Sequence, residues 1–425
     1  MRERLFIFLF VCVSSLWSQR LSEKRVGRQV QKIEAFQKAH VAISISPLEG
    51  ATPMAQYQAA HYMTPASNTK LLTFLGASQQ FKELPAVSYF KEKDSIIHFK
   101  STGYPLLFHP FYKDTILDAF FNQKGLWNYH VNKDSPKPHG SGWAWDDYSY
   151  YYAAETSVFP IYGNTLQAQI DAKELKMSPS FFASKTVLDS LGKAFKRAYD
   201  RNTFHFNPAA WTAGDTLYRP FITSDSLFVK LLEHEIGQPV QVADGNSAEP
   251  QWNFLYTAAE ETLYSALLQD SDNGIAEALL LMISQKNFNG MTPEKAIALL
   301  LDQWKPWLPD PIAWVDGSGI SRYNMITPRT VVRVLQKIYE TVGWQTIESY
   351  FPKGATSGTL KKYSNTALYA KTGTLRHNHN LSGYWVHPKG KTYVFSIMVN
   401  HHTASTTEVR EGIGTLLEWF ERKLR

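Results

Sequence analysis

The sequence predicts a mixed α/β (α+β) fold, in which an antiparallel sheet flanked by helices carries a large, mostly β insertion. Three observations support this prediction. A helical segment and an alternating apolar strand open the chain, two strand-like runs and an amphipathic helix close it, and short strands separated by turns fill the middle. Because both ends of the chain are predicted to contain helices and strands, unlike the mostly β middle, we expect the two ends to form one domain.

The first elements are a helix and a strand. We expect the helix over residues Glu23 to Lys38. The strand follows in "HVAISIS", where Val41, Ile43 and Ile45 alternate with smaller residues. A second helix is expected to start within "TPASNTKLL", soon after this strand.

The middle of the chain changes to short strands and turns from about Val87. The run "VSYFKEKDSIIHFK" predicts a hairpin with a polar turn at Glu92 to Asp94, and "NKDSPKPHGSG" predicts a loop. Strong helical periodicity returns only near Thr257. We therefore assign residues 20–86 and 251–425 to one domain, and residues 87–250 to the insertion.

The last elements are two strands, "NLSGYWV" and "TYVFSIMV", and a C-terminal helix. The helix has one apolar face, which could lie on a membrane surface or pack on the protein's own sheet. We favour the second alternative, because such terminal helices usually complete a core. The residues of this face are Val409, Ile413, Leu416, Leu417, Phe420 and Leu424.

Charge and composition exclude several classes of protein. The 425 residues include 44 Lys and Arg against 38 Asp and Glu, for a formal net charge of +6, and the two signs are interspersed. A nucleic-acid partner is therefore not expected. No segment after the N-terminus has the 18 consecutive apolar residues of a membrane span, so we expect no integral membrane segment.

The N-terminus has the pattern of a secretory signal peptide. Arg2 and Arg4 precede an apolar run from Leu5 to Val13, and small residues follow before Gln19. We expect residues 1–19 to be removed on export to the periplasm or cell wall. The single cysteine, Cys12, lies in this segment, so the mature chain would contain neither thiol nor disulfide. A lipoprotein is the weaker alternative, because bulky residues precede Cys12.

Ser67 and Lys70 form the first candidate catalytic pair. On a helix their spacing places both side chains on one face. A serine hydroxyl needs a base within hydrogen-bond reach, and a lysine whose pKa is lowered by burial or by a neighbouring cation can serve. The pair alone is a weak signal, because a helix start followed by a solvated lysine has the same pattern.

Two further motifs strengthen the interpretation. "SDN" at Ser271 to Asn273 opens an apolar helical run, and "KTG" at Lys371 to Gly373 precedes a strand. The order Ser-x-x-Lys, Ser-Asp-Asn, Lys-Thr-Gly is the motif set of penicillin-recognising enzymes, which this chain resembles. Ser271 can relay a proton between Lys70 and the leaving group.

Substrate binding is assigned from residue type. Asn273 can hold the substrate's amide, and Lys371 with Thr372 can bind a free carboxylate. Gly373 would let the substrate backbone approach the strand, and the backbone N–H of Thr374 would complete an oxyanion hole.

The chain resembles the D-alanyl-D-alanine carboxypeptidases and endopeptidases known as class C low-molecular-mass penicillin-binding proteins. The similar segments are "TPASNTKLLTFLGA", "GWAWDDYSYYYAAETS", "LLQDSDNGIAEALLLM", "VDGSGISRYN" and "AKTGTLRHNHNLSGYW", in the family's order, from about residue 25 to the C-terminus. The resemblance implies a transpeptidase/β-lactamase-like domain with extra domains in the long interval between Ser67 and Ser271.

Two segments depart from the expected motifs. "DGSGISRYN" contains Ser321 and Asn324 at the wrong spacing, and we expect it to form a tight turn that supports the cleft. Gly103-Tyr104-Pro105 stands where the family often has Gly-Asp-Pro, so any role of that acid is lost or moved.

The aromatic run "WAWDDYSYYY" includes Asp147, an acid that the resemblance places near the distal amine of a diamino acid in the peptide stem. An aromatic core with capping acids is the alternative. His377, His379, His401 and His402 suggest a metal site, but alternation on paired strands explains them without one. We therefore expect neither a metal nor an organic cofactor.

The resemblance implies acyl transfer from peptidoglycan stem peptides through an acyl-enzyme on Ser67, with β-lactams as covalent inhibitors. Both carboxypeptidase and endopeptidase activity are expected. The alternatives are a slow β-lactamase, an esterase and a catalytically silent peptidoglycan-binding protein. The chain has no Glu-x-x-Leu-Asn segment after "SDN" to position a deacylating water, so penicillin hydrolysis should be slow.

Overall fold

The computed structural model describes residues 20–424 apart from residues 51, 93–95, 172–173, 213 and 244–250. The predicted signal peptide, residues 1–19, and most of the predicted turn at Glu92 to Asp94 lie outside the described residues.

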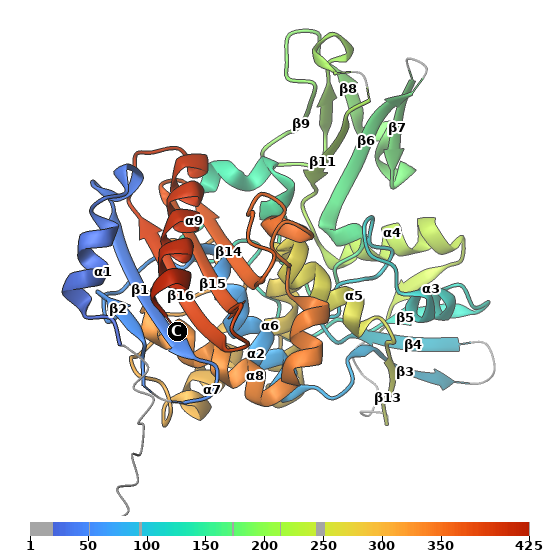
Figure 1. The fold of residues 1–425 in the computed structure, drawn as a ribbon. Coiled ribbons are helices and arrows are strands. Elements are labelled where there is room, and N and C mark those ends of the chain that lie inside the picture. Colours follow the sequence, from blue (N-terminus) through green and yellow to red (C-terminus); the bar gives the residue numbers. More distant parts are fainter. Residues whose placement is uncertain are drawn as a thin grey trace, which may run out of the picture.

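The main sheet joins the two ends of the chain, as predicted. Its strand order is β14-β15-β16-β1-β2, and every neighbouring pair is antiparallel (Figure 1). The first strand pairs directly with the last, with Ile43 opposite Ile397. The strands are β1 (His40–Pro47), β2 (Ala55–Tyr57), β14 (Leu368–Leu375), β15 (Asn378–Val386) and β16 (Thr392–Asn400).

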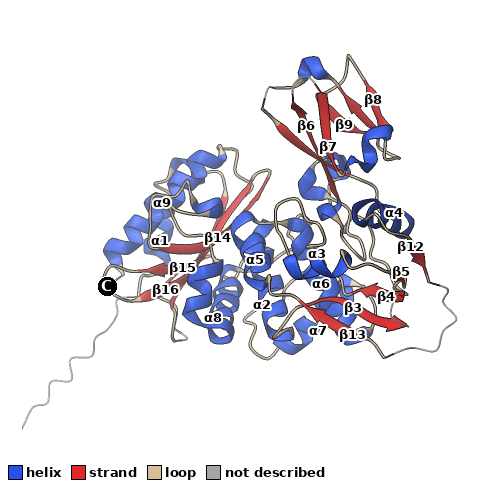
Figure 2. Cartoon of the chain, turned by 90° about the vertical axis from the view of Figure 1, so that its right-hand side faces the viewer, coloured by secondary structure: helices blue, strands red, loops and turns tan. Residues whose placement is uncertain are grey.

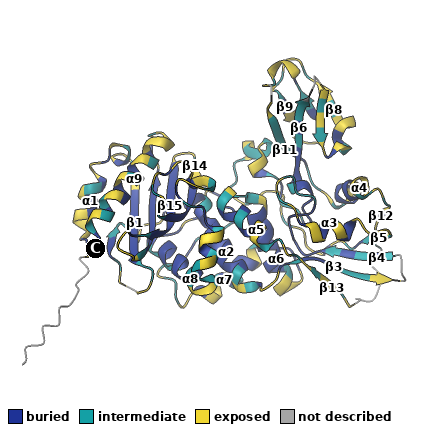
Figure 3. Ribbon diagram, turned by 45° about the vertical axis from the view of Figure 1, so that its right-hand side comes forward, coloured by how far each residue is buried: buried dark blue, intermediate teal, exposed yellow. Residues whose placement is uncertain are grey.

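Helices cover both faces of this sheet and create two hydrophobic cores (Figure 3). The smaller core lies between the sheet and the two terminal helices, α1 (Glu23–Val30) and α9 (Thr406–Lys423). All six residues of the predicted apolar face of α9 are buried here, so the helix packs on its own sheet. The other helices of the two ends are α2 (Lys70–Gln80), α5 (Glu260–Ser265), α6 (Asn273–Phe288), α7 (Pro293–Trp304) and α8 (Pro328–Tyr350).

The prediction of one helix from Glu23 to Lys38 is wrong beyond Val30. The chain turns at Gln31, Ile33 is extended, and a short 3₁₀ turn follows at Glu34–Phe36. Packing explains the break, because it directs the side chains of Ile33 and Phe36 onto Gly412 of α9. A Cβ at Gly412 would lie 2.8 Å from Ile33 and 2.9 Å from Phe36.

The inserted region is mostly β, as predicted. A five-stranded sheet with the order β12-β5-β4-β3-β13 forms its base, and two three-stranded sheets, β8-β10-β9 and β11-β6-β7, project from the rest of the molecule (Figure 2). Strands β3 and β4 pair as the predicted antiparallel hairpin. The base sheet comprises β3 (Pro85–Glu92), β4 (Ile96–Ser101), β5 (Leu126–Tyr129) and β12 (Val240–Val242), with helices α3 (Thr115–Phe121) and α4 (Asp225–Ile236). Its edge strand β13 (Asn253–Tyr256) follows the predicted end of the insertion and pairs with β3.

The projecting sheets are formed by β6 (Thr165–Asp171), β7 (Glu174–Ser178), β8 (Thr186–Leu188), β9 (Phe195–Arg197), β10 (Phe204–Phe206) and β11 (Thr216–Pro220). The larger hydrophobic core is continuous between the inserted region and the domain formed by the two ends of the chain, here called the end-built domain. It includes Phe99 and Trp127 of the base sheet together with Phe74 of α2 and Leu279 of α6. The predicted domain boundaries remain a prediction.

Candidate active site

Ser67 lies in a 3₁₀ turn, Ala66–Thr69, directly before α2. This turn is held against the edge strand β14. A Cβ at Gly373 would lie 2.3 Å from the carbonyl oxygen of Pro65, and Asn68 Nδ2 donates to Ser382 Oγ at 2.8 Å. Gly373 is therefore needed for the approach of the protein's own nucleophile turn. Our expectation that it serves the approach of a substrate backbone missed this contact.

Lys70 is fully buried, and its Nζ has three oxygen neighbours. It lies 3.2 Å from Ser67 Oγ, 2.6 Å from Asn273 Oδ1 and 2.7 Å from the carbonyl oxygen of Ser318. A neutral amine has two hydrogens and one lone pair. With the two hydrogens donated to Asn273 and Ser318, the lone pair faces the hydroxyl of Ser67. The predicted pair is thus brought together in the geometry that a general base requires.

Burial is the main cause of a lowered pKa at Lys70, which falls from 10.5 to about 8. The negative charges of Asp316, Glu277 and Asp272 oppose this change and favour the ammonium. A substantial fraction of Lys70 is consequently neutral near pH 8.

Lys371, on β14, is the second buried lysine of the site. Its Nζ donates to Ser271 Oγ at 2.8 Å and to the carbonyl oxygen of Thr372 at 3.1 Å. Burial and then the positive charge of Lys70 hold the pKa of Lys371 well below its usual range. Lys70 and Lys371 would repel each other if both were protonated. Simultaneous protonation is therefore disfavoured, which helps to keep one of the two amines neutral.

The "SDN" segment forms the predicted turn into a buried helix. Ser271 has a left-handed backbone, with φ 63°, after a π-helical turn at Ala266–Asp270, and the side chain of Asp272 caps α6 by accepting from Ile275 N. Ser271 contacts Lys371, and the described hydrogen bonds of Lys70 do not include it.

Asn273 connects the base to the inserted region. Its Oδ1 accepts from Lys70, and its Nδ2 donates to the backbone oxygen of Tyr152 at 2.7 Å. The hydroxyl of Tyr152 donates in turn to Asp147 Oδ1 at 2.8 Å. Asp147 is thus linked to Asn273 through the full length of the Tyr152 side chain. The alternative of an aromatic core is wrong, because Trp145 is 75% exposed and Tyr151 is 58% exposed.

Thr374 is exposed at the end of β14, and its Oγ1 lies 2.8 Å from His379 Nδ1. The other ring nitrogen of His379 lies 2.8 Å from the hydroxyl of Tyr363. Burial lowers the pKa of His379 to about 4, so the ring is neutral at ordinary pH. Within the described residues, no group of three or more His, Cys, Asp or Glu side chains is arranged to hold a metal ion.

The family model described as D-Ala-D-Ala carboxypeptidase 3 (S13) matches residues 22–84 and 237–420, more than half of the chain. The chain belongs to this S13 carboxypeptidase family. The resemblance stated from the motifs is thereby confirmed.

Curated relatives of this S13 protein match over parts of their length. Penicillin-sensitive carboxypeptidase A of Dictyostelium discoideum is 36% identical over 108 residues, 22% of this chain and 20% of that protein. D-alanyl-D-alanine carboxypeptidase DacB of Haemophilus influenzae is 22% identical over 324 residues, 67% of this chain and 66% of that protein. The D-alanyl-D-alanine carboxypeptidase of Actinomadura sp. strain R39 is 30% identical over 212 residues, 45% of this chain and 39% of that protein. The chain thus spans between a fifth and two thirds of the length of these relatives.

Solved structures show the same fold. Penicillin binding protein 4 (dacB) of Haemophilus influenzae superposes with a TM-score of 0.71 at 17% identity, over 93% of this chain and 99% of that one. The peptidoglycan endopeptidase Bd3459 of Bdellovibrio bacteriovorus gives a TM-score of 0.54 at 13% identity, over 91% and 94%. The predicted fold class is confirmed.

Two buried acids beside the candidate site, Glu277 and Asp316, were not predicted from the sequence. Asp316 accepts from the backbone of Gly319 and Ser321, from Asn324 Nδ2 and from Trp143 Nε1, at 2.6 to 2.9 Å. The glycine-rich segment is thus the predicted supporting turn. A glutamate inside the apolar run "GIAEALLLMI" was the available signal for Glu277, because an unpaired buried carboxylate is costly.

Ser321 and Asn324 do not form a second catalytic motif. Ser321 Oγ donates to the carbonyl oxygen of Ser141 at 2.7 Å, and Asn324 Nδ2 is bonded to Asp316. Tyr323, between them, is 63% exposed. Their side chains are engaged in hydrogen bonds of the loop.

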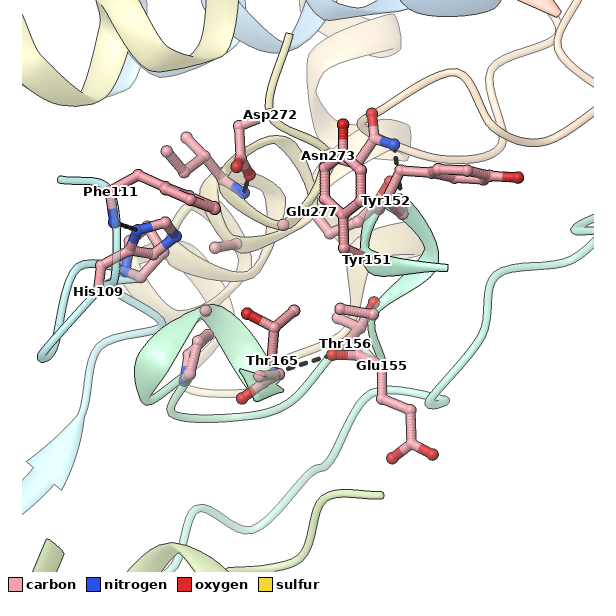
Figure 4. A pocket seen from close by; sticks show the side chains of 18 of the residues that line it. His109, Phe111, Tyr151, Tyr152, Glu155, Thr156, Thr165, Asp272, Asn273 and Glu277 are labelled. Carbon is pink, nitrogen blue, oxygen red and sulfur yellow. Dashed lines mark hydrogen bonds between the residues drawn. The ribbon is translucent and has the colours of Figure 1, made fainter. Parts of the chain in front are cut away.

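A cavity of about 590 Å³ adjoins the site on the side of the inserted region (Figure 4). Its wall includes Ser271, Asn273 and Tyr152, together with His109 and Phe111 from the loop before α3. The cavity therefore meets the site at the "SDN" turn, where the two parts of the chain come together.

Among the helices of the described residues, none combines the length and the apolar character that a membrane span requires.

Proposed function

We propose that the protein is a serine D-Ala-D-Ala carboxypeptidase that also acts as a DD-endopeptidase on peptidoglycan stem peptides. The observation that carries the proposal is the position of Lys70 Nζ, buried and 3.2 Å from Ser67 Oγ with its other two contacts fixed. Membership of the S13 family and the names of the curated relatives support the reaction and the substrate class.

The first step is acylation of Ser67. Neutral Lys70 removes the hydroxyl proton, and Ser67 Oγ attacks the carbonyl between the last two D-alanines. The backbone N–H groups of Ser67 and Thr374 stabilise the oxyanion. The edge position of β14 leaves room for a substrate strand beside Thr374.

The second step is departure of the amine. Ser271 donates its hydroxyl proton to the leaving nitrogen and regains a proton from the ammonium of Lys70, which must first turn toward Ser271 because its present bonds are to Ser67, Asn273 and Ser318. Because Ser271 Oγ accepts from Lys371, its own hydrogen is free for donation. Water then hydrolyses the acyl-enzyme.

The remaining predicted residues bind the substrate. Lys371 and Thr372 hold the terminal carboxylate, and Asn273 holds the stem's amide while it contacts Lys70. Asp147 approaches the distal amine of a diamino acid in the stem, and the hydroxyl of Tyr152 holds its carboxylate in place.

β-Lactams mimic the terminal D-alanines and acylate the same serine. A solved complex of penicillin binding protein 4 from Haemophilus influenzae with a β-lactam supports this part of the proposal. The signal-like residues 1–19 support export to the periplasm or cell wall, where the peptide stems lie.

The test uses the mature protein and a fluorescent penicillin, with the adduct located by mass spectrometry. Stable labelling at Ser67 is expected, and it should vanish in Ser67→Ala. Ser190→Ala, an exposed serine of the inserted region, is the control and should label normally.

Absence of labelling in the wild type would contradict the proposal and favour a silent peptidoglycan-binding protein. Labelling that decays within seconds would favour a β-lactamase. Release of D-alanine from a pentapeptide and cleavage of a cross-linked dimer then measure the two peptidase activities separately.

A further inference from the structure

Glu277 is a buried carboxylate that the reaction above does not use. It lies on α6, one helical turn after Asn273, and is 5% exposed. Its Oε1 accepts from Ser318 N at 2.8 Å, and its Oε2 accepts from Gly317 N at 3.0 Å. Both oxygens accept backbone hydrogens, which is the pattern of an ionised carboxylate.

The two backbone groups belong to the turn that contacts the catalytic base. The carbonyl oxygen of Ser318 accepts from Lys70 Nζ at 2.7 Å, and that of Gly317 accepts from Thr73 Oγ1 at 2.7 Å. A Cβ at Gly317 would lie 2.4 Å from the backbone oxygen of Ala276, so the turn is pressed against α6. Glu277 therefore holds the backbone N–H groups of Gly317 and Ser318, and the carbonyl oxygen of Ser318 in the same turn holds Lys70.

We propose that Glu277 is a positioning residue for acylation. Its carboxylate holds the Gly317–Ser318 turn so that one hydrogen of Lys70 is committed to Ser318, and the lone pair of Lys70 faces Ser67. This inference rests on the proposed function, because it assigns Glu277 a role through the base of that reaction.

Charge gives the inference a second, measurable consequence. The charged groups that face Lys70 are Glu277 from α6, Asp272 at the start of α6, Asp316 from the turn and Lys371 from β14. The Glu277 carboxylate raises the pKa of Lys70 against the effect of burial. Burial and then Asp316 raise the pKa of Glu277 itself to about 7, although the side chain of Ser318 and the two backbone donors lower it, so Glu277 is charged where Lys70 titrates.

The experiment measures the second-order rate constant for acylation of the mature protein by benzylpenicillin between pH 6 and pH 9.5. The variants are Glu277→Gln, which removes the charge and sets an amide N–H₂ against a backbone donor, and Glu277→Asp, which keeps the charge but shortens the reach. Thermal unfolding of each variant shows whether it is folded.

Glu155→Gln is the matched control. Glu155 is 8% exposed and also holds a backbone group, because its Oε2 accepts from Thr223 N at 2.7 Å. Glu155 is one of the residues around the cavity beside the site, but its carboxylate points away from the cavity (Figure 4). This variant should keep the wild-type rate and pH profile.

Glu277→Gln should lower the plateau rate by about tenfold or more and move the acid limb to lower pH by roughly 0.5 to 1 unit. Loss of the carboxylate lowers the pKa of Lys70, so the amine stays neutral to lower pH. Glu277→Asp should lower the rate and leave the acid limb in place.

An unshifted acid limb in folded Glu277→Gln would overturn the inference, because a purely structural defect lowers the rate equally at every pH. Should Glu277→Gln not fold, a wild-type rate in Glu277→Asp would overturn it instead. Failure of the proposed function is distinguishable, since the wild type itself would then not be acylated.

Discussion

The domain built from the two ends of the chain and the inserted region contribute differently to the site. Ser67, Lys70, Asn273 and Lys371 come from the ends. The inserted region bonds to Asn273 through the backbone oxygen of Tyr152, and to the supporting turn through Trp143 and Ser141. The family match covers residues 22–84 and 237–420 and leaves residues 85–236 unmatched.

In the hydrophobic core, by contrast, both parts of the chain contribute to one cluster. Phe99 and Trp127 of the inserted region belong to the same buried cluster as Phe74 and Leu279, next to the catalytic helices. The inserted region thus stabilises α2 and α6 and forms one wall of the adjoining cavity. The comparison teaches that it supports the site without supplying a reacting group.

The largest expected effect is that of removing the base from the end-built domain. Lys70→Met should reduce the acylation rate by about 10³-fold, because Ser67 loses its proton acceptor. Stopped-flow measurement with a chromogenic β-lactam gives the rate. The exposed Lys82→Met should label normally, and a Lys70 variant with wild-type rate would remove lysine from the mechanism.

The next effect comes from Gly373→Ala. The new Cβ would lie 2.3 Å from Pro65 O and 2.9 Å from Asn68 N, so the nucleophile turn must move. We expect acylation to fall by about 100-fold, because a displacement of that size spoils the attack geometry.

Gly414→Ala provides the control, since a Cβ there meets nothing within 4 Å. It should keep the wild-type rate and gain slightly in thermal stability, because alanine favours a helix. An unchanged rate in Gly373→Ala would show that the contact with β14 does not set the geometry of Ser67.

The pH dependence of acylation is expected to be moderate and to come from the end-built domain alone. Lys70 acts when neutral, so the rate should rise with pH and level off above about 8. Below that value it should fall by about tenfold per unit. A flat profile from pH 6 to 9 would contradict the assignment of Lys70 as base.

The smallest effect is expected from the inserted region. Tyr152→Phe removes the hydrogen bond to Asp147 and retains the backbone oxygen that accepts from Asn273. Acylation by penicillin should change by less than about threefold, because the lost bond is exposed to solvent and involves neither Ser67 nor Lys70. A loss comparable to that of Gly373→Ala would show that the inserted region takes part in the chemistry.

The sequence was sufficient for the chemistry and for the order of the main elements. The motifs at Ser67, Ser271 and Lys371 are local patterns whose residue types carry their own chemical meaning. The alternating strands and the apolar face of the last helix follow from periodicity, which records burial along the chain. These features require no knowledge of which segments meet.

Only the tertiary structure decided which groups surround each motif. The break of the first helix at Val30, the contact of Gly373 with Pro65 and the role of Glu277 all depend on segments far apart in sequence. The lowered pKa of Lys70 is of the same kind, because it results from burial of the side chain in the folded protein. Sequence determines the functional groups, whereas their protonation and direction are fixed by neighbours that folding brings within a few ångströms.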